Sequence, residues 1–288
     1  MIVGQGLQVR PAVPSDVHQI AGLLQTSSQV HRHMDWCSPL DWIGSPPFFV
    51  VENQGQVFAA LGCSPDPPQV AWVRLFANSG KIPVKESWQM LWDSTKANLA
   101  QRGQFITAAI VLQEWLRDML ISSGFTKHQL IILLERNDEN PPTPNLPTDI
   151  SLRRIKPADL PAVAEVDFSA FELIWRNSLP VLEKAYPQAE WATLAEMDGQ
   201  VIGYQLSTRN SLGLHLARLA VRPELQGKRI GSALVSDLIQ QAARAGIPHL
   251  TVNTQSDNAA SLALYQRLGF HENGERYPVY QLCIPSGG

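Results

Sequence analysis

A short basic turn at residues 226–229 carries the groups best suited to bind a charged ligand. A mostly strand-forming apolar stretch precedes it at 214–221, and apolar residues at helical spacing follow it from Ile230. A helix N-terminus leaves backbone N–H groups unpaired and carries about half a positive charge, which suits phosphate or pyrophosphate. The residues that would form the site are Gln226, Gly227, Lys228, Arg229, Ile230, Gly231 and Ser232. The alternative is an ordinary strand-to-helix turn with solvated charges.

A second strand-to-helix passage follows at 250–270. Its apolar, β-branched run ends at Gln255, and Asp257 or Asn258 can cap the helix that comes next. This helix carries Tyr265, and Gly269 stands where glycine commonly ends a helix. The pattern therefore predicts two strand–turn–helix units in succession.

Together the two passages, QGKRIGSALV and then NAASLALYQRLGF, resemble the GNAT superfamily of N-acetyltransferases. The resemblance covers roughly residues 150–284 and is closest to the type that acetylates ribosomal-protein alanine or small amines. It implies an α/β fold with a twisted mixed sheet flanked by helices. It also implies acetyl-CoA as co-substrate, direct acetyl transfer to a primary amine, and two central strands that splay apart toward the cofactor.

The same resemblance implies roles for single residues. A backbone N–H of Leu219, Ala220 or Val221 would stabilise the oxyanion. Tyr265 would be the general acid that protonates the leaving thiolate, with inward aromatic packing as the alternative. Asn258 would bind coenzyme A or a structural water, with a plain helix cap as the alternative.

The base that deprotonates the amine stays open. In the subgroup that acetylates protein N-termini, a Glu precedes the Asn helix, but this sequence has Asn253 there. Glu196 before a hairpin turn, His215 on the central strand and Glu172 are the candidates, and a pKa near 6.5 suits His215 to the task. An ordinary surface or core position is the alternative for each.

Arg229 departs from the family pattern, which has a glycine at this place of the turn. An arginine does not block binding if the ligand contacts the backbone N–H. We expect the local backbone here to be helical rather than in a conformation that only glycine adopts.

The chain also repeats itself. Arg10, Asp16 and Gly124 match Arg153, Asp159 and Gly269 at nearly one separation. Two copies of one domain are therefore expected, at 1–134 and 150–288, joined by a Pro-rich linker at 135–149, with chance similarity as the alternative.

The first copy has lost the residues that define the site. Residues 78–86 lack the phosphate turn, and Gln113 and Leu120 replace the Asn and the Tyr. We expect a degenerate copy that binds no cofactor and shapes a wall of the substrate cleft. Its aromatic residues would line that wall or, for most of them, form the core: Trp36, Trp42, Phe48, Phe49, Trp72, Trp88 and Trp92.

Composition excludes several classes. With 288 residues, of which 44% are hydrophobic, the chain can form two packed cores, and a net charge of −3 gives no bulk attraction to nucleic acid or membrane. No signal segment or long apolar run is present, so a cytoplasmic location is expected. Cys37, Cys63 and Cys283 form neither a disulfide framework nor a metal motif, and no metal is expected.

We expect an acetyl-CoA-dependent N-acetyltransferase whose acceptor is a small molecule or a peptide N-terminus, as a monomer or homodimer. One alternative is a non-catalytic protein that binds or senses coenzyme A. The other is a tandem enzyme of the mycothiol-synthase type, which acetylates the amine of a thiol-containing sugar.

Overall fold

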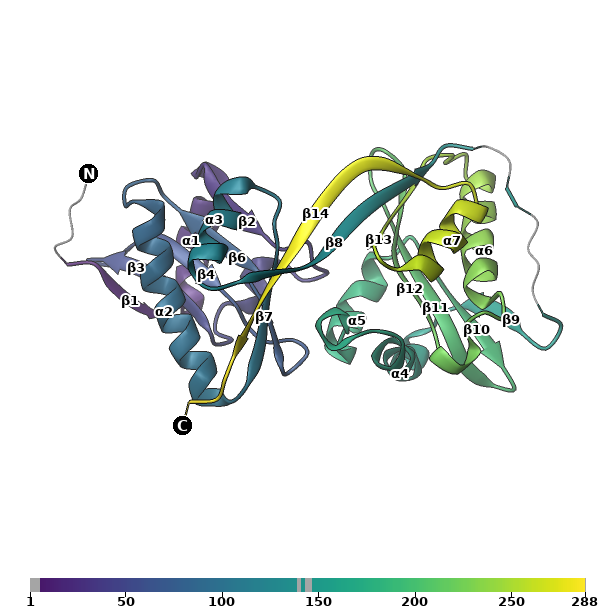
Figure 1. Cartoon of the computed structure of the whole chain (residues 1–288), viewed down its shortest axis with the longest axis horizontal. Helices are drawn as coiled ribbons and strands as arrows, with labels where there is room; N and C mark the ends of the chain where they lie inside the picture. Colours follow the sequence, from purple (N-terminus) through teal and green to yellow (C-terminus); the bar gives the residue numbers. More distant parts are fainter. Residues whose placement is uncertain (1–5, 139–140, 143–146, 288) are drawn as a thin grey trace. The chain divides into compact units, whose positions relative to one another are not determined.

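The computed structural model describes residues 6–138, 141–142 and 147–287. It divides into two compact units, which we call unit 1 (Met1–His128 with Pro278–Gly288) and unit 2 (Gln129–Tyr277). Each is a mixed α/β unit with sheet and flanking helices (Figure 1), which confirms the expected fold class. Residues 139–140 and 143–146 of the expected linker lie outside the described residues.

Unit 2 has a six-strand succession, β8-β13-β12-β11-β10-β9, in which β12 and β13 are parallel and the other neighbours antiparallel. Gly203 faces Ile230 of α6, whereas the next residue, Tyr204, faces Asp167 of α4, so these helices cover opposite faces of the sheet (Figure 1). The elements are β8 (Thr126–Arg136), β9 (Ser151–Arg154), α4 (Leu160–Ala170), α5 (Leu179–Ala185), β10 (Trp191–Met197), β11 (Gln200–Arg209), β12 (Leu214–Val221), α6 (Ile230–Arg244), β13 (Leu250–Gln255) and α7 (Ala259–Arg267).

Helix α6 forms because its apolar residues recur at helical spacing. Ile230, Leu234, Leu238 and Ala242 are buried along one face and pack on the sheet. Gly246, with φ of 68°, ends the helix in the left-handed conformation that favours glycine. This helix begins at the end of the basic turn, as the sequence predicts.

Unit 1 repeats this plan and, within the described residues, has one strand without a counterpart in unit 2, β2, because β5 and β6 together pair as β12 does. Its strands follow the orders β1-β3-β4-β6-β2 and β5-β7-β14. Trp72, Trp88, Trp92 and Phe48 are at most 5% exposed, so these aromatic residues form core rather than a cleft wall. The elements are β1 (Gln8–Pro11), α1 (Val17–Thr26), β2 (Gln29–Arg32), β3 (Phe48–Asn53), β4 (Gln56–Gly62), β5 (Val70–Trp72), β6 (Leu75–Asn78), α2 (Val84–Arg102), β7 (Phe105–Ile110), α3 (Glu114–Ser122) and β14 (His271–Ile284).

The final strand of each repeat belongs to the other unit. Residues 131–136 of β8, which follows α3 of unit 1, pair with β13 in unit 2. Residues 279–284 of β14, which follows α7 of unit 2, pair with β7 in unit 1. The structural units therefore divide after residues 128 and 277, while the copy boundaries at 134 and 150 stay predictions about the sequence repeat.

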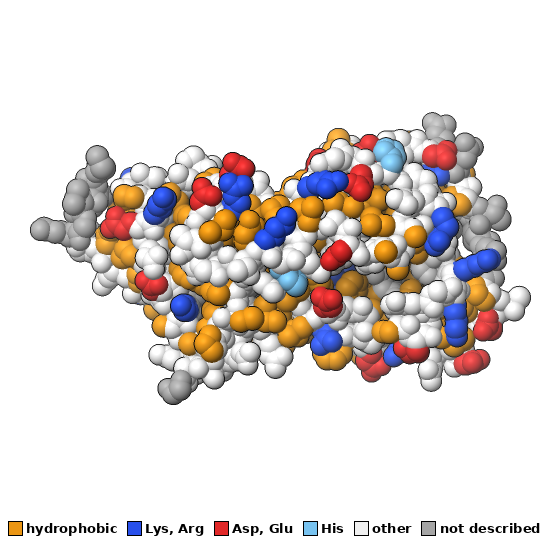
Figure 2. Space-filling model, in the orientation of Figure 1, with side chains coloured by type: hydrophobic (Ala, Val, Ile, Leu, Met, Phe, Trp, Pro, Cys, Tyr) orange, Lys and Arg blue, Asp and Glu red, His pale blue; other side chains and the backbone are white. Residues whose placement is uncertain are grey.

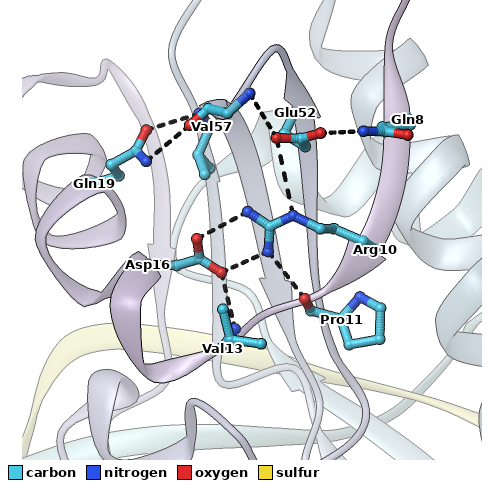
Figure 3. A network of polar contacts seen from close by, with 9 residues as sticks. Gln8, Arg10, Pro11, Val13, Asp16, Gln19, Glu52 and Val57 are labelled. Carbon is cyan, nitrogen blue, oxygen red and sulfur yellow. Dashed lines mark hydrogen bonds and ion pairs between the residues drawn. The ribbon is translucent and has the colours of Figure 1, made fainter.

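A duplicated ion-pair network supports the repeat, and Figure 3 shows the copy of it in unit 1. In unit 1, the two terminal nitrogens of Arg10 donate to Asp16 at 2.7 and 2.9 Å, and Arg10 Nε lies 3.9 Å from Glu52. In unit 2, Arg153 donates to Asp159 at 2.7 and 3.0 Å and to Glu196 at 2.8 Å. In both copies the Asp caps the same short helical turn, and the Glu sits at a β-bulge of the strand alongside. Two such matched networks argue against chance similarity.

The surface charge and the search for membrane spans, metal ligands and disulfides indicate no further kind of site. On the face shown in Figure 2, acidic and basic side chains are interspersed rather than gathered by sign. Within the described residues, no helix is both long and apolar enough to cross a membrane. No group of three or more His, Cys, Asp or Glu in that part of the chain could hold a metal ion, and none of the three cysteines there forms a disulfide.

Candidate active site

The centre of the candidate site is a fork between β12 and β13. The two strands pair over only three positions, Leu214 with Leu250, His215 with Thr251 and Leu216 with Val252. Beyond Leu216, β12 continues to Val221 beside β11 alone. Within the described residues, the edge of β12 from Arg218 to Val221 thus has no strand on the β13 side. The strands part as the family resemblance implies.

A β-bulge at Ala217 sets which side chains face this fork. Leu216 pairs with Ser207 and Arg218 with Leu206, so Ala217 is an extra residue without a partner on β11. Leu214 and Leu216 face α6 before the bulge, and Leu219 and Val221 face it afterwards. Because strand side chains alternate, the extra residue moves Arg218 to the α4 face.

Helix α6 starts at the end of the fork with its backbone donors free. No side chain caps the helix, and within the described residues the N–H groups of Ile230, Gly231 and Ser232 have no acceptor. Helices α5 and α7, by contrast, are capped by Ser178 and Asn258. The open helix start is the arrangement that binds phosphate.

The backbone at Arg229 corrects one expectation from the sequence. We expected a helical conformation, but Arg229 has φ of 65° and ψ of 6°, which is left-handed. The turn must reverse there to enter α6, since Arg229 is the residue before the helix and its carbonyl accepts the bond from Ala233 N at 2.9 Å. The position therefore does favour the glycine of the family pattern, and an arginine there strains the backbone.

Two glycines are needed at the turn and the helix start for different reasons. Gly227 has φ of 78° and needs the freedom of glycine. A Cβ on Gly231 would lie 3.1 Å from Leu264 of α7, so the start of α6 and α7 pack closely. The turn residues and α7 are thus held together beside the fork.

Helix α7 places both of its predicted site residues. The side chain of Asn258 caps the helix by accepting from Ser261 N at 3.1 Å. Tyr265 is 4% exposed, packs against Phe270 with ring centroids 5.7 Å apart, and has no hydrogen-bond partner for its hydroxyl within the described residues. Burial raises the pKa of Tyr265 well above its ordinary value, so the hydroxyl stays protonated.

The three candidate bases occupy different surroundings. Glu196 lies on β10, two strands from β12, and is ion-paired with Arg153 at 2.8 Å. Glu172 is exposed ahead of the short helical turn Leu173–Trp175. His215 is on β12 itself, at the fork, with Nδ1 2.9 Å from Thr251 Oγ1, and burial lowers its pKa. Only His215 lies on a strand of the fork.

A buried polar network on the α4 face was missed by the sequence reasoning. The Asp167 carboxylate accepts from Tyr204 Oη at 2.5 Å, from Arg218 at 2.7 and 2.8 Å, and from Asn177 N at 2.7 Å. Arg218 lies 3.6 Å above the Phe171 ring. The network joins α4 to β12 immediately after the bulge. The signal that could have revealed it is that Asp167 recurs at helical spacing with the apolar Leu160 and Val163.

Comparison with known proteins agrees with this geometry. Residues 160–270 match the acetyltransferase (GNAT) family. The mycothiol acetyltransferase of Streptomyces coelicolor is 33% identical over 149 residues, which cover 47% of this chain and 48% of that protein. The [ribosomal protein bS18]-alanine N-acetyltransferase of Escherichia coli is 27% identical over 107 residues, which cover 33% of this chain and 72% of that protein. The match thus spans about half the length of the mycothiol enzyme.

A solved structure has the same arrangement over its whole length. A tandem GNAT protein from the clavulanic acid biosynthesis pathway matches with a TM-score of 0.64 at 16% identity, covering 98% of this chain and 100% of that one. At that identity the likeness concerns the fold. The fork, the open helix start and the family match all lie in unit 2, so residues 160–270 are acetyltransferase (GNAT) sequence, and the whole chain has the fold of tandem GNAT proteins.

Proposed function

We propose that unit 2 transfers an acetyl group from acetyl-CoA directly to a primary amine of a small molecule or a peptide N-terminus. The observation that carries the proposal is the unpaired edge of β12, which leads into the uncapped start of α6. The amide groups of a pantetheine arm can pair with such an edge as an added strand would. The pyrophosphate would then meet the free N–H groups of residues 230–232, with Lys228 and Arg229 beside it.

The acetyl carbonyl would lie along the same edge. Attack by the amine turns its oxygen into an oxyanion, which a backbone N–H of Leu219, Ala220 or Val221 can stabilise. The Asp167–Arg218 ion pair fixes the edge at the bulge, so we assign it a positioning role. A donor held in place before the reaction stabilises the oxyanion without reorganisation.

Tyr265 is the proposed general acid. Its raised pKa keeps a proton available at neutral pH, and its hydroxyl has no competing partner within the described residues. The departing thiolate of coenzyme A takes that proton as the tetrahedral intermediate collapses. No covalent enzyme intermediate is needed.

His215 is the base that the geometry favours. Burial lowers its pKa, so the imidazole is neutral at pH 7 and can accept a proton, directly or through a water. Glu196 is paired with Arg153 in a network that unit 1 repeats through Glu52, which points to a structural role.

Calorimetric titration with acetyl-CoA tests the binding half of the proposal. We expect one site per chain, and no heat of binding from the folded protein would overturn the proposal. Turnover then tests the acid. Tyr265→Phe should lower kcat by about 100-fold or more with little change in acetyl-CoA affinity, whereas Tyr280→Phe, a buried tyrosine of unit 1, should change neither. Equal turnover by Tyr265→Phe would remove the acid role.

The acceptor is best approached with a panel of amines. The relation to the mycothiol acetyltransferase favours including a thiol-containing sugar amine, and the relation to the ribosomal-protein enzyme favours peptides with N-terminal alanine. The ratio of kcat/KM values across the panel would separate these two classes. Binding of acetyl-CoA with no turnover of any amine would favour the non-catalytic alternative.

A further inference from the structure

A cavity lies in unit 2, away from the fork. It has a volume of about 510 Å³ and opens between the β9–β10 edge of the sheet and the second half of α6. Asp237, Gln241 and Arg244 line it from the helix, and Arg154, Trp191 and Thr193 line it from the strands. The volume is within the range of small-molecule sites. None of the residues proposed to bind acetyl-CoA lines it.

The acidic side of the cavity is a built polar cluster. Asp237 accepts from Gln241 at 2.5 Å and from Thr193 Oγ1 at 3.4 Å. Thr193 is 3% exposed and is contacted in turn by the fully buried Gln205, whose Oε1 has no partner within the described residues. All the partners of Asp237 in that part of the chain are neutral, so its charge is not compensated. A half-buried carboxylate in that state favours a cation as ligand.

The arginines on the basic side of the cavity also lack a partner of opposite charge within the described residues. Neither Arg154 nor Arg244 has an acidic partner within the described residues, in contrast to the neighbouring Arg153, which is bound to Asp159 and Glu196. Guanidinium groups that line a cavity are suited to bind a carboxylate or phosphate. Leu152 and Trp191 supply the apolar surface of the same cavity.

We propose that this cavity binds a small zwitterion whose amine meets Asp237 and whose anionic group meets Arg154 and Arg244. Asp237 and Arg244 are seven positions apart on α6, so their Cα atoms are roughly 10 Å apart along the helix. Helical side chains lean toward the N-terminus, which brings Arg244 toward Asp237. A flexible amine–acid chain of about six carbons has that reach, with its methylene groups on Leu152 and Trp191.

Binding of ω-amino acids to the full chain tests the assignment. The probes are the series from β-alanine to 8-aminooctanoate, followed through the indole N–H signal of Trp191, which Trp191→Phe identifies. We expect saturable binding that is tightest near 6-aminohexanoate. Hexanoate and hexylamine, which each lack one charge, should bind at least about 10-fold more weakly, as 1.4 kcal/mol per lost contact corresponds to tenfold.

Variants separate the two ends of the site. Asp237→Asn should weaken the binding of 6-aminohexanoate about 10-fold and leave the binding of hexanoate unchanged. Arg244→Gln should likewise weaken the binding of 6-aminohexanoate and leave the binding of hexylamine unchanged. Arg117→Gln, an exposed arginine of unit 1, is the matched control and should bind as the parent does. No saturable signal for any probe, equal binding by Asp237→Asn, or displacement of the probe by acetyl-CoA would each overturn the proposal.

Discussion

In unit 2, no strand of the described residues pairs with Arg218–Val221 of β12 on the side away from β11, whereas the equivalent strand of unit 1, β6, is paired with β2. The equivalence follows from register, because β6 pairs with β4 as this part of β12 pairs with β11. Strand β2 comes from the segment between α1 and β3, and it occupies the place where unit 2 is proposed to hold the pantetheine arm. Unit 1 thus fills its own cofactor edge with a piece of its own chain.

The turns that follow these strands differ in the same direction. In unit 1, Asn78 accepts from Gly80 N at 2.6 Å and donates to Ser87 Oγ at 2.5 Å, and Pro83 precedes α2 without an N–H. In unit 2, the N–H groups of residues 230–232 have no acceptor among the residues that the structure describes. The void left between β2 and the start of α3 is about 30 Å³, roughly the space of one water. In unit 1, side chains and backbone therefore make hydrogen bonds at the positions where unit 2 is proposed to bind the cofactor.

The largest effect is expected from removing β8. A fragment of residues 150–277 lacks Ile132 and Leu134, each 1% exposed in the core of unit 2. Losing large buried side chains costs about 2–5 kcal/mol each, and the free energy of unfolding of a domain is only about 5–15 kcal/mol. We expect this fragment to be unfolded by circular dichroism and the fragment 129–277 to fold and bind acetyl-CoA. If both fragments unfolded cooperatively, β8 would not be required for unit 2 to fold.

His215→Gln tests the proton transfer that is proposed for unit 2. Because the base must be neutral, kcat/KM should rise with pH through the lowered pKa of His215, below 6.5, and then level off. The variant should lose about 100-fold in kcat/KM and lose this acid limb. Glu196→Gln is the control, and it should keep both the rate and the limb, since breaking a partly exposed ion pair costs at most about 1 kcal/mol of stability. If Glu196→Gln, and not His215→Gln, abolished the fall of kcat/KM at low pH, Glu196 would be the base and His215 would not.

His31 lies on β2, the strand that pairs with β6 in unit 1, and the pH dependence of stability tests how firmly this strand is buried. It is 4% exposed, its Nε2 lies 2.9 Å from the carbonyl of Val73, and burial lowers its pKa to about 4. The unfolded chain binds this proton below about pH 6.5 and the folded chain does not, so the free energy of unfolding should fall between pH 6.5 and 4, by up to about 3 kcal/mol. Denaturant titration of the parent and His31→Gln measures it. The same pH slope in both proteins would assign the loss to another group.

Arg229→Gly should act most weakly, through the backbone. Removing a side chain from the left-handed position relieves roughly 1 kcal/mol of strain, although glycine also makes the unfolded chain freer. We expect a net gain of about 0.5 kcal/mol in the free energy of unfolding, and a loss for Lys228→Gly, whose φ is not positive. Acetyl-CoA should bind a few-fold more weakly to both, because each loses one charge beside the pyrophosphate. Destabilisation by Arg229→Gly would show that the side chain has a contact of its own.

Local patterns were enough to predict the turn at 226–229, the start of α6 at Ile230 and the Asn258 cap, because each depends on neighbours in sequence. The matched Arg and Asp pairs of the two copies were visible for the same reason. The exchange of β8 and β14 was not, because either copy could pair its last strand in either unit with the same apolar pattern. The Asp167–Arg218 pair and the left-handed Arg229 depend on tertiary contacts and on the turn's path, which no residue type specifies alone.

The exchange of the last strands also sets an order of assembly. During synthesis, residues 1–128 leave the ribosome before any of unit 2, yet β7 lacks its β14 neighbour until residues 279–284 have also left the ribosome. Unit 2 has by then emerged with all of its strands, including β8. The part of the chain that is made first is therefore completed last, with an open sheet edge exposed for as long as the second unit is being translated.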